Sequence, residues 1–150
     1  MIFEWRNWRR NRIGCISALL IVSALSAACA TQPISNQAAI MAPYDQILDN
    51  SLFAPRPDTV EVTVKRDSGF GGSACSSRIF VDAKPVADIR ASQKIILYLS
   101  KSEHILGASP NGYCGGGTVE VRADLRSGAP ASFRVGYGSN SDFFINQTAF

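Results

Sequence analysis

The stretch from Cys75 to Cys114 reads CSSRIFVDAKPVADIRASQKIILYLSKSEHILGASPNGYC and decides the fold of the chain. Short runs rich in Ile, Val and Leu recur along it. Turn-forming segments such as Ala83-Lys84-Pro85 and Ser100-Lys101-Ser102 separate these runs, which therefore read as four short strands. A glycine-rich loop stands at each end, Gly69-Phe70-Gly71-Gly72 before the first cysteine and Gly115-Gly116-Gly117 after the second.

The two cysteines that bound this stretch are predicted to form a disulfide, Cys75–Cys114, because the compartment argued below is oxidising. For a closed loop of about 40 residues, the chain-entropy account of a cross-link gives about 4 kcal/mol. That is a large share of the stability of a domain of this size.

Outside this stretch the hydrophobic residues also recur with a period of two. Val60, Val62 and Val64 alternate with polar residues, which is typical of a half-buried strand. The same alternation recurs in Val119-Val121-Ala123, Phe133-Val135-Tyr137 and Phe143-Ile145. Residues 95–99 are apolar at every position and are predicted to be buried on both faces. The pattern predicts an all-β fold, a small antiparallel β-sandwich of seven to eight short strands over residues 58–150.

The positive net charge of the chain is concentrated in its first 29 residues. The sequence has 15 Lys+Arg and 12 Asp+Glu, and this first segment holds four arginines against Glu4 alone. The rest of the chain is therefore neutral. A neutral body lacks the long-range field that gathers phosphates, which argues against nucleic-acid binding.

Residues 1–29 have the organisation of a secretory signal. A basic head precedes the run Ile13–Ala28, which is apolar or small throughout and is shorter than the roughly 20 residues that a membrane span needs. Leu25-Ser26-Ala27-Ala28-Cys29 resembles the lipobox of bacterial lipoproteins, which implies a lipid on Cys29 as the first residue of the mature chain. Two alternatives stay open: cleavage by ordinary signal peptidase after Ala30, and an uncleaved anchor.

The same resemblance implies a location. Lipoproteins of Gram-negative cells that stay in the inner membrane carry Asp after the lipidated cysteine, and this chain has Ala30 there. The outer membrane, on its periplasmic face, is therefore the expected site, with inner-membrane anchorage or a free periplasmic form as the alternatives. Several acyl chains hold a protein durably without a membrane span.

Residues 30–57 contain four prolines and no strand alternation, so they are predicted to be a flexible linker. As a flexible coil this segment would reach roughly 30 Å from the membrane. Tyr44, Ile47, Leu48 and Leu52 fall at helical spacing, which predicts a short helix lying against the domain.

One family resemblance covers residues 65–108. Strands around Asp82-Ala83-Lys84 and a later Ser102-Glu103-His104 turn resemble the strand–(Asp-Gly-Lys)–strand–strand–(Pro-Gly-x-His)–strand order of PEGA-like domains. Arg66-Asp67-Ser68-Gly69-Phe70-Gly71 is similar to a segment of DUF2846-type small lipoproteins. The resemblance implies a β-sandwich in the cell envelope and brings no catalytic residues. Ala83 and Ser102 stand where the family has glycine, so both turns are expected to use a different geometry.

Candidate chemistry is sparse. His104 is the only histidine; as a base it would need a serine (Ser73, Ser76 or Ser77) and a carboxylate such as Asp67. No Gly-x-Ser-x-Gly elbow is present, and a structural role in a turn is favoured. Zinc held by His104 and the two cysteines would lack any Cys-x-x-Cys pair, and oxidation would remove two ligands, so no metal or cofactor is predicted.

These observations favour a non-catalytic, lipid-anchored sandwich that contacts the membrane through its lipid and another envelope protein through its body. The alternative is a periplasmic inhibitor or ligand-binding protein, and a hydrolase using His104 is a distant third. The binding edge of the alternative would be the glycine loops, at Phe70, Gly71, Gly72, Gly115 and Gly116.

Overall fold

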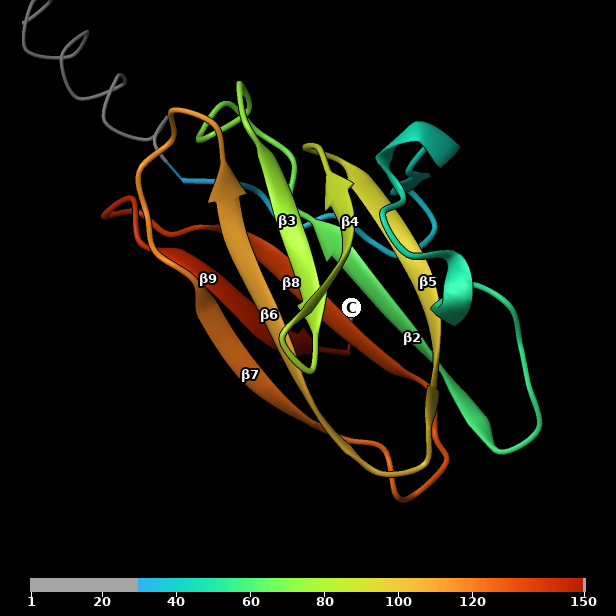
Figure 1. Ribbon diagram of the computed structural model, residues 1–150. Helices are drawn as coiled ribbons and strands as arrows, with labels where there is room; N and C mark the ends of the chain where they lie inside the picture. Colours follow the sequence, from blue (N-terminus) through green and yellow to red (C-terminus); the bar gives the residue numbers. More distant parts are fainter. Residues whose placement is uncertain (1–29, 150) are drawn as a thin grey trace, which may run out of the picture.

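The computed structural model describes residues 30–149, which form two packed β-sheets with only two short 3-10 turns (Figure 1). One sheet has the order β1-β5-β2-β8-β9 and the other β4-β3-β6-β7. The all-β sandwich predicted from the alternation is confirmed. The strands are β1 (Ile40–Met41), β2 (Thr59–Arg66), β3 (Ser76–Val81), β4 (Lys84–Ile89), β5 (Gln93–Ser100), β6 (Glu103–Asn111), β7 (Val119–Asp124), β8 (Ala131–Tyr137) and β9 (Phe143–Thr148).

Two strand pairs depart from the antiparallel expectation. β1 runs parallel to β5, and β2 runs parallel to β8, with Val62 opposite Ala131 and Arg66 opposite Val135. β2 and β8 are neighbours in one sheet although the four strands of the other sheet lie between them in the sequence. Alternation identifies a strand and its buried face, but it carries no information about the partner or the direction of pairing.

The core lies between the sheets and is built from the predicted alternating residues. Val60, Val62 and Val64 of β2 are at most 2% exposed. In β5, Ile95, Leu97 and Leu99 are buried, whereas Ile96 and Tyr98 on the other face are only half-buried. The prediction that residues 95–99 are buried on both faces is therefore wrong for the outer face.

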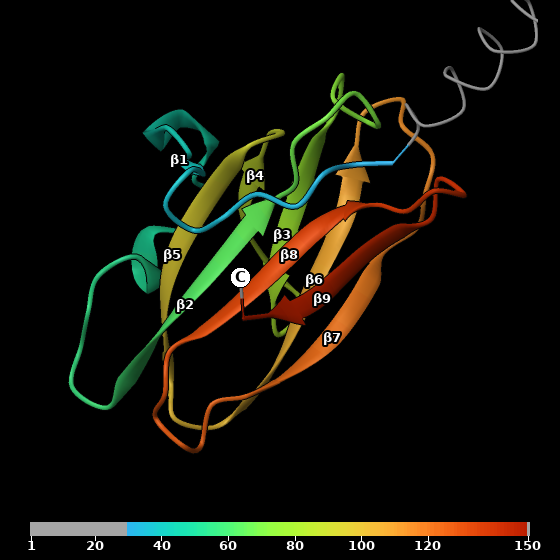
Figure 2. The ribbon, with the colours of Figure 1, turned by 180° about the vertical axis from the view of Figure 1, so that it is seen from behind.

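The segment 30–57 is not the flexible linker predicted from its prolines. Gln32 pairs with Ser68, and Ile47 forms a bridge to Ala87 of β4. Figure 2 shows the beginning of this segment crossing the end of the five-stranded sheet. The predicted short helix takes the form of two 3-10 turns, η2 (Tyr44–Gln46) and η3 (Asn50–Leu52), which contact β4 and β5 respectively.

This segment changes the burial of β2. Asn36 donates to Ser132 Oγ of β8 at 2.8 Å, and Lys94 of β5 donates to the Asn36 carbonyl, so the segment lies over the sheet between these strands. Thr63 and Lys65, which the alternation places on a solvent-facing side, are 6% and 0% exposed. Burial lowers the pKa of the Lys65 ammonium, an effect that the nearby Asp67 opposes. β2 is therefore buried on both faces along most of its length.

The β3–β4 turn stores backbone strain. Asp82 and Ala83 have φ values of 49° and 65°, so Ala83 keeps the left-handed geometry that the family glycine would provide, contrary to expectation. Ser102 is not among the described residues with positive φ. A residue other than glycine in the left-handed backbone conformation raises the free energy of the folded state by roughly 1–2 kcal/mol.

An Ala83→Gly variant is expected to be more stable than the wild type by about 0.5–1 kcal/mol, because relief of this strain exceeds the entropy cost of glycine. Urea unfolding of purified protein measures the change. Ala129→Gly is the matched control, since Ala129 is an exposed loop alanine without positive φ. A destabilised Ala83→Gly variant would contradict the strain argument.

Candidate functional site

Three loops gather at the end of the sandwich where the described chain begins (Figure 1). They are residues 67–75 between β2 and β3, residues 112–118 between β6 and β7, and residues 138–142 between β8 and β9. We call this region the loop end. It contains every residue of the predicted binding loop and the two predicted disulfide cysteines.

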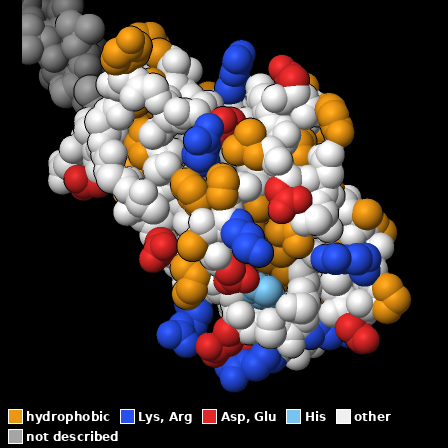
Figure 3. Space-filling model, viewed as in Figure 1, with side chains coloured by type: hydrophobic (Ala, Val, Ile, Leu, Met, Phe, Trp, Pro, Cys, Tyr) orange, Lys and Arg blue, Asp and Glu red, His pale blue; other side chains and the backbone are white. Residues whose placement is uncertain are grey.

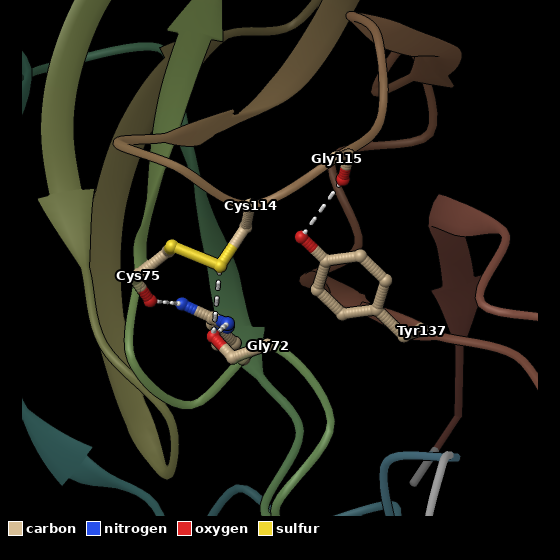
Figure 4. The surroundings of a disulfide bond; sticks show 6 residues. Gly72, Cys75, Cys114, Gly115 and Tyr137 are labelled. Atoms are coloured by element: carbon tan, nitrogen blue, oxygen red, sulfur yellow. Dashed lines mark hydrogen bonds between the residues drawn. A yellow bond between two sulfur atoms is a disulfide. The ribbon is translucent and has the colours of Figure 1, made fainter.

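The predicted disulfide is present at the loop end. Cys75 and Cys114 are bonded, with their Cα atoms 6.1 Å apart (Figure 4). The Tyr137 hydroxyl donates to the Gly115 carbonyl at 3.3 Å, which ties the second loop to β8. The first two loops are thus cross-linked to each other and to the sheet beneath them.

A buried arginine, Arg66, supports the first loop from inside. Its Nη1 donates to the Cys75 carbonyl and its Nη2 to the Gly72 carbonyl, while the residue is 1% exposed. Burial lowers the pKa of Arg66, but an arginine remains charged at any physiological pH. The sequence carried no signal for this role, because Lys65-Arg66-Asp67 reads as the polar end of a strand.

Two of the loop glycines are required by packing. Gly72 has φ of 63°, and a Cβ there would lie 2.2 Å from the Tyr137 ring. Gly116 has φ of 119°, and its Cβ would lie 3.1 Å from Phe143 and Pro110. Gly115 and Gly117, by contrast, have open space around them. At Gly72 and Gly116 the glycine thus permits close packing and leaves no room for a ligand.

The loop end also exposes two aromatic side chains. Phe70 is 84% exposed and Tyr113 is fully exposed, and each lies within five residues of a disulfide cysteine. An open pocket of about 770 Å³ lies beside the disulfide, lined by residues 73–76 and 111–114 and by Arg90. The loop end therefore consists of two cross-linked loops, each with an exposed aromatic side chain, Phe70 or Tyr113, which we call the tips.

A buried ion pair joins the loop end to the first described residues. Asp67 is 0% exposed and accepts hydrogen bonds from Arg134 Nε at 3.2 Å, from Arg134 Nη2 and from the Thr31 hydroxyl at 3.2 Å. Arg134 also lies over the Phe144 ring, 5.1 Å from its centroid. These contacts give Asp67 a structural role, and the carboxylate that a hydrolase using His104 would need is held elsewhere.

His104 lies at the opposite end of the sandwich, where it is visible as the one pale blue side chain of Figure 3. Its Nδ1 is 2.7 Å from Asp82 Oδ2, and its Nε2 is 3.0 Å from Ser100 Oγ and 3.1 Å from Ser102 Oγ. The ring therefore joins the β3–β4 turn to the β5–β6 turn. A pocket of about 490 Å³ adjoins it, with Arg56 and Lys84 among its lining residues.

The structure does not assemble the serine or zinc sets that the disfavoured alternatives for His104 would need. Ser76 and Ser77 begin β3 and pair with Asn111 and Pro110, whereas His104 lies near the other end of that strand. The serine set proposed with His104 therefore does not converge. The zinc set does not converge either, since the two cysteines are bonded to each other at the loop end. No sequence pattern indicates Ser100 and Ser102 as the partners of His104, because their contacts with the ring depend on the geometry of the turn.

The pKa of the Asp82 carboxylate is lowered in the folded protein, which makes the stability depend on pH. Partial burial raises its pKa, but hydrogen bonds from the Ile105 amide and the His104 ring outweigh this and hold the pKa below the ordinary 3.8. When folding lowers the pKa of a carboxylate, its ionised form stabilises the fold at any pH above the pKa of the unfolded state. This stabilisation is lost as the pH falls through the lower pKa of the folded state.

An Asp82→Asn variant is therefore expected to be less stable than the wild type at pH 7. The difference should shrink as the pH falls from 5 through the lowered pKa, because the wild type then protonates Asp82. Asparagine tolerates the left-handed backbone of this position, so the turn is retained. Unfolding curves of both proteins between pH 7 and pH 2 measure the difference; a constant difference across this range would contradict the assignment.

The described residues thus define an all-β sandwich pinned by one disulfide at its loop end. Comparison with family models, with characterised proteins and with solved structures gives no match for this chain. The resemblance to PEGA-like and DUF2846-type domains therefore stays a prediction. Over residues 30–149, no helix has the length and apolarity needed to cross a membrane. The predicted signal and lipidation segment, residues 1–29, lies outside the described residues.

Proposed function

We propose that this protein is a non-catalytic lipoprotein of the bacterial cell envelope whose sandwich binds another envelope protein. Its anchor is the lipid on Cys29, and its location is the periplasmic face of the outer membrane. The lipobox-like sequence supports the anchor, and an exposed apolar surface supports the protein contact.

The observation that carries this proposal is the exposure of four large apolar side chains on one short segment. Ile40, Met41, Tyr44 and Leu48 are 67%, 50%, 76% and 48% exposed. We call them the edge patch, because they lie on β1, an edge strand of the five-stranded sheet, and on the turn that follows it. Apolar side chains gathered on a surface mark contact sites more often than isolated ones do.

The backbone holds the edge patch in place. The amides of Ile40 and Ala42 donate to the carbonyls of Ser92 and Lys94 at 2.9 Å, and Leu48 donates to Val86. Ala39, next to the patch, is 4% exposed, so the segment already buries one of its side chains. A patch that is ordered in advance costs little conformational entropy when a partner binds.

Site-specific photo-crosslinking tests the protein contact. A benzoylphenylalanine at position 40 or 44, in the full chain in its own membrane, is expected to capture the same protein. The control position is Ser127, which is exposed in the β7–β8 loop. Adding Met41→Asp should abolish the adduct without unfolding the domain, since Met41 is half exposed. Equal capture from position 127, or capture that survives Met41→Asp, would refute the edge patch as the contact.

The anchor has its own test. Labelled palmitate should be incorporated by the wild type and lost in Cys29→Ser. Cys15 precedes the lipobox-like site and is removed with the signal, so Cys15→Ser is the matched control and should still be labelled. Labelling that persists in Cys29→Ser would overturn the lipid assignment.

A second candidate is a periplasmic inhibitor or ligand-binding protein that uses the loop end. The exposed Phe70 and Tyr113 favour it, because aromatic tips beside a rigid loop are suited to binding. A hydrolase finds support in the contacts of His104 with Asp82 and two serines. A structural role agrees with the same contacts, since both serines belong to the turn that the ring holds. An enzyme would require that His104→Ala abolish a turnover that the wild type displays, with the fold intact.

A further inference from the structure

The chain is fixed to the domain immediately after the proposed lipid site. Thr31 is 7% exposed; its amide donates to the Tyr137 carbonyl at 3.0 Å, and its hydroxyl accepts from the Tyr137 amide at 2.9 Å. Gln32 and Ser68 exchange two backbone hydrogen bonds. Two residues span at most about 7 Å, so Cys29 stays within that distance of Thr31. A lipid on Cys29 would therefore leave the domain no spacer.

The exposed aromatic tip of the first loop lies beside this attachment point. A Cβ on Gly69 would be 3.5 Å from Thr31 Cα and 3.6 Å from the Ala30 carbonyl, so the loop before Phe70 packs against the first described residues. The disulfide links this loop to the one that carries Tyr113. Figure 3 shows hydrophobic side chains at the end of the molecule opposite the pale blue histidine.

The composition of the loop end is suited to a lipid interface. Residues 67–75, 112–118 and 138–142 contain no lysine or arginine, and their charged residues are the buried Asp67 and the exposed Asp142. Arg90, which follows β4 and is exposed, lines the pocket beside the disulfide. Tyrosine is favoured at membrane interfaces because one end of its side chain is apolar and the other meets water, and phenylalanine adds a wholly apolar ring. Contact through the two aromatic side chains does not depend on anionic lipid, because these side chains are uncharged and the three loops carry no lysine or arginine.

We propose that the loop end lies on the surface of the membrane that holds the anchor, with Phe70 and Tyr113 in its interfacial layer. This inference rests on the proposed lipid at Cys29. It fixes the orientation of the domain: the His104 end points away from the bilayer, and the edge patch lies to the side. The disulfide and Arg66 keep the two tips rigid, so little entropy is lost when they enter the interface.

Single-tryptophan reporters test this orientation. Both native tryptophans, Trp5 and Trp8, precede Cys29, so the mature lipidated chain contains none. Phe70→Trp and Tyr113→Trp place a reporter at each tip. Ala129→Trp is the matched control, because residue 129 is an exposed position beyond the far end of β7, about 20 Å along the strand from the loop end. Each lipidated protein is reconstituted into phosphatidylcholine–phosphatidylethanolamine vesicles, with and without brominated acyl chains.

The tip reporters are expected to show blue-shifted fluorescence and to lose most of its intensity when the vesicles contain brominated lipid. The reporter at residue 129 should keep its fluorescence in brominated vesicles and should be quenched by aqueous iodide. This result should not change in high salt. If the protein floats with the vesicles but iodide still quenches the tip reporters, the docking is overturned and the anchor is not. Protein that does not float and lacks the mass of the acyl chains would overturn the anchor, and the docking with it.

Discussion

A Cys75→Ala, Cys114→Ala double variant is expected to lose about 4 kcal/mol of unfolding free energy. The cross-link closes a loop with a sequence separation of 39 residues, and its removal enlarges the ensemble of the unfolded chain. Alanine is the appropriate replacement because Cys75 is 8% exposed, so a serine hydroxyl there would be largely withdrawn from water.

Urea unfolding under non-reducing conditions measures this loss. Either single variant breaks the same bond, so each should lose nearly as much as the double variant. The slope of the unfolding free energy against urea should also rise, because an unfolded chain without the cross-link exposes more surface. A loss below about 1 kcal/mol would mean that the hydrogen bonds of Arg66 to Gly72 and Cys75 hold the loop without the sulfur bridge.

The second large effect is expected from the buried pair of Asp67 and Arg134. An Arg134→Met variant removes the two Arg134 hydrogen bonds from the Asp67 carboxylate, which is 0% exposed and keeps the Thr31 hydroxyl and the nearby Lys65 charge. Loss of one partner of a buried pair costs roughly 3–5 kcal/mol. Asp67→Asn should cost less, because the Arg134 side chain is 25% exposed and its charge reaches water.

A double-mutant cycle separates the pair from its surroundings. Arg134→Met and Asp67→Asn together should cost less than the sum of the two single changes, since the double variant no longer buries the Asp67 charge without Arg134. Arg126→Met is the control: Arg126 and Asp124 form a pair in which both side chains are about half exposed or more, and its loss should change the stability little. Additive single effects at Asp67 and Arg134 would contradict the coupling.

The Asp67 pair also bears on orientation. Asp67 and Tyr137 hold Thr31, which lies two residues after the proposed lipid site. A variant that frees Thr31 should therefore lengthen the tether as well as destabilise the fold. A Cβ on Gly136 would lie 2.4 Å from the Thr31 hydroxyl and 2.6 Å from Asp67 Oδ2, which shows how tightly this junction is packed.

The errors in the sequence reasoning have a common origin. Prolines made residues 30–57 read as a coil, yet this segment covers the sheet and buries Lys65. Period-two alternation placed Lys65 toward solvent, because alternation reports only which residues share a face. The turn at Ala83 was expected to change its geometry, but the His104–Asp82 contact and the β3–β4 pairing hold the strained backbone in place.

Local chemistry in the sequence was sufficient for the strand class, for the buried valines of β2 and for the bond between Cys75 and Cys114. The strands and their buried valines follow from spacing and side-chain type, which act over short distances. The disulfide follows from the two thiols and from the oxidising compartment that the N-terminal pattern predicts. The parallel neighbours β2 and β8, the burial of Arg66 and Asp67, and the gathering of Thr31, Phe70 and Tyr113 at one end were decided only by the tertiary structure. They depend on segments far apart in the chain, whose contacts are set by how two sheets and a covering strand pack together.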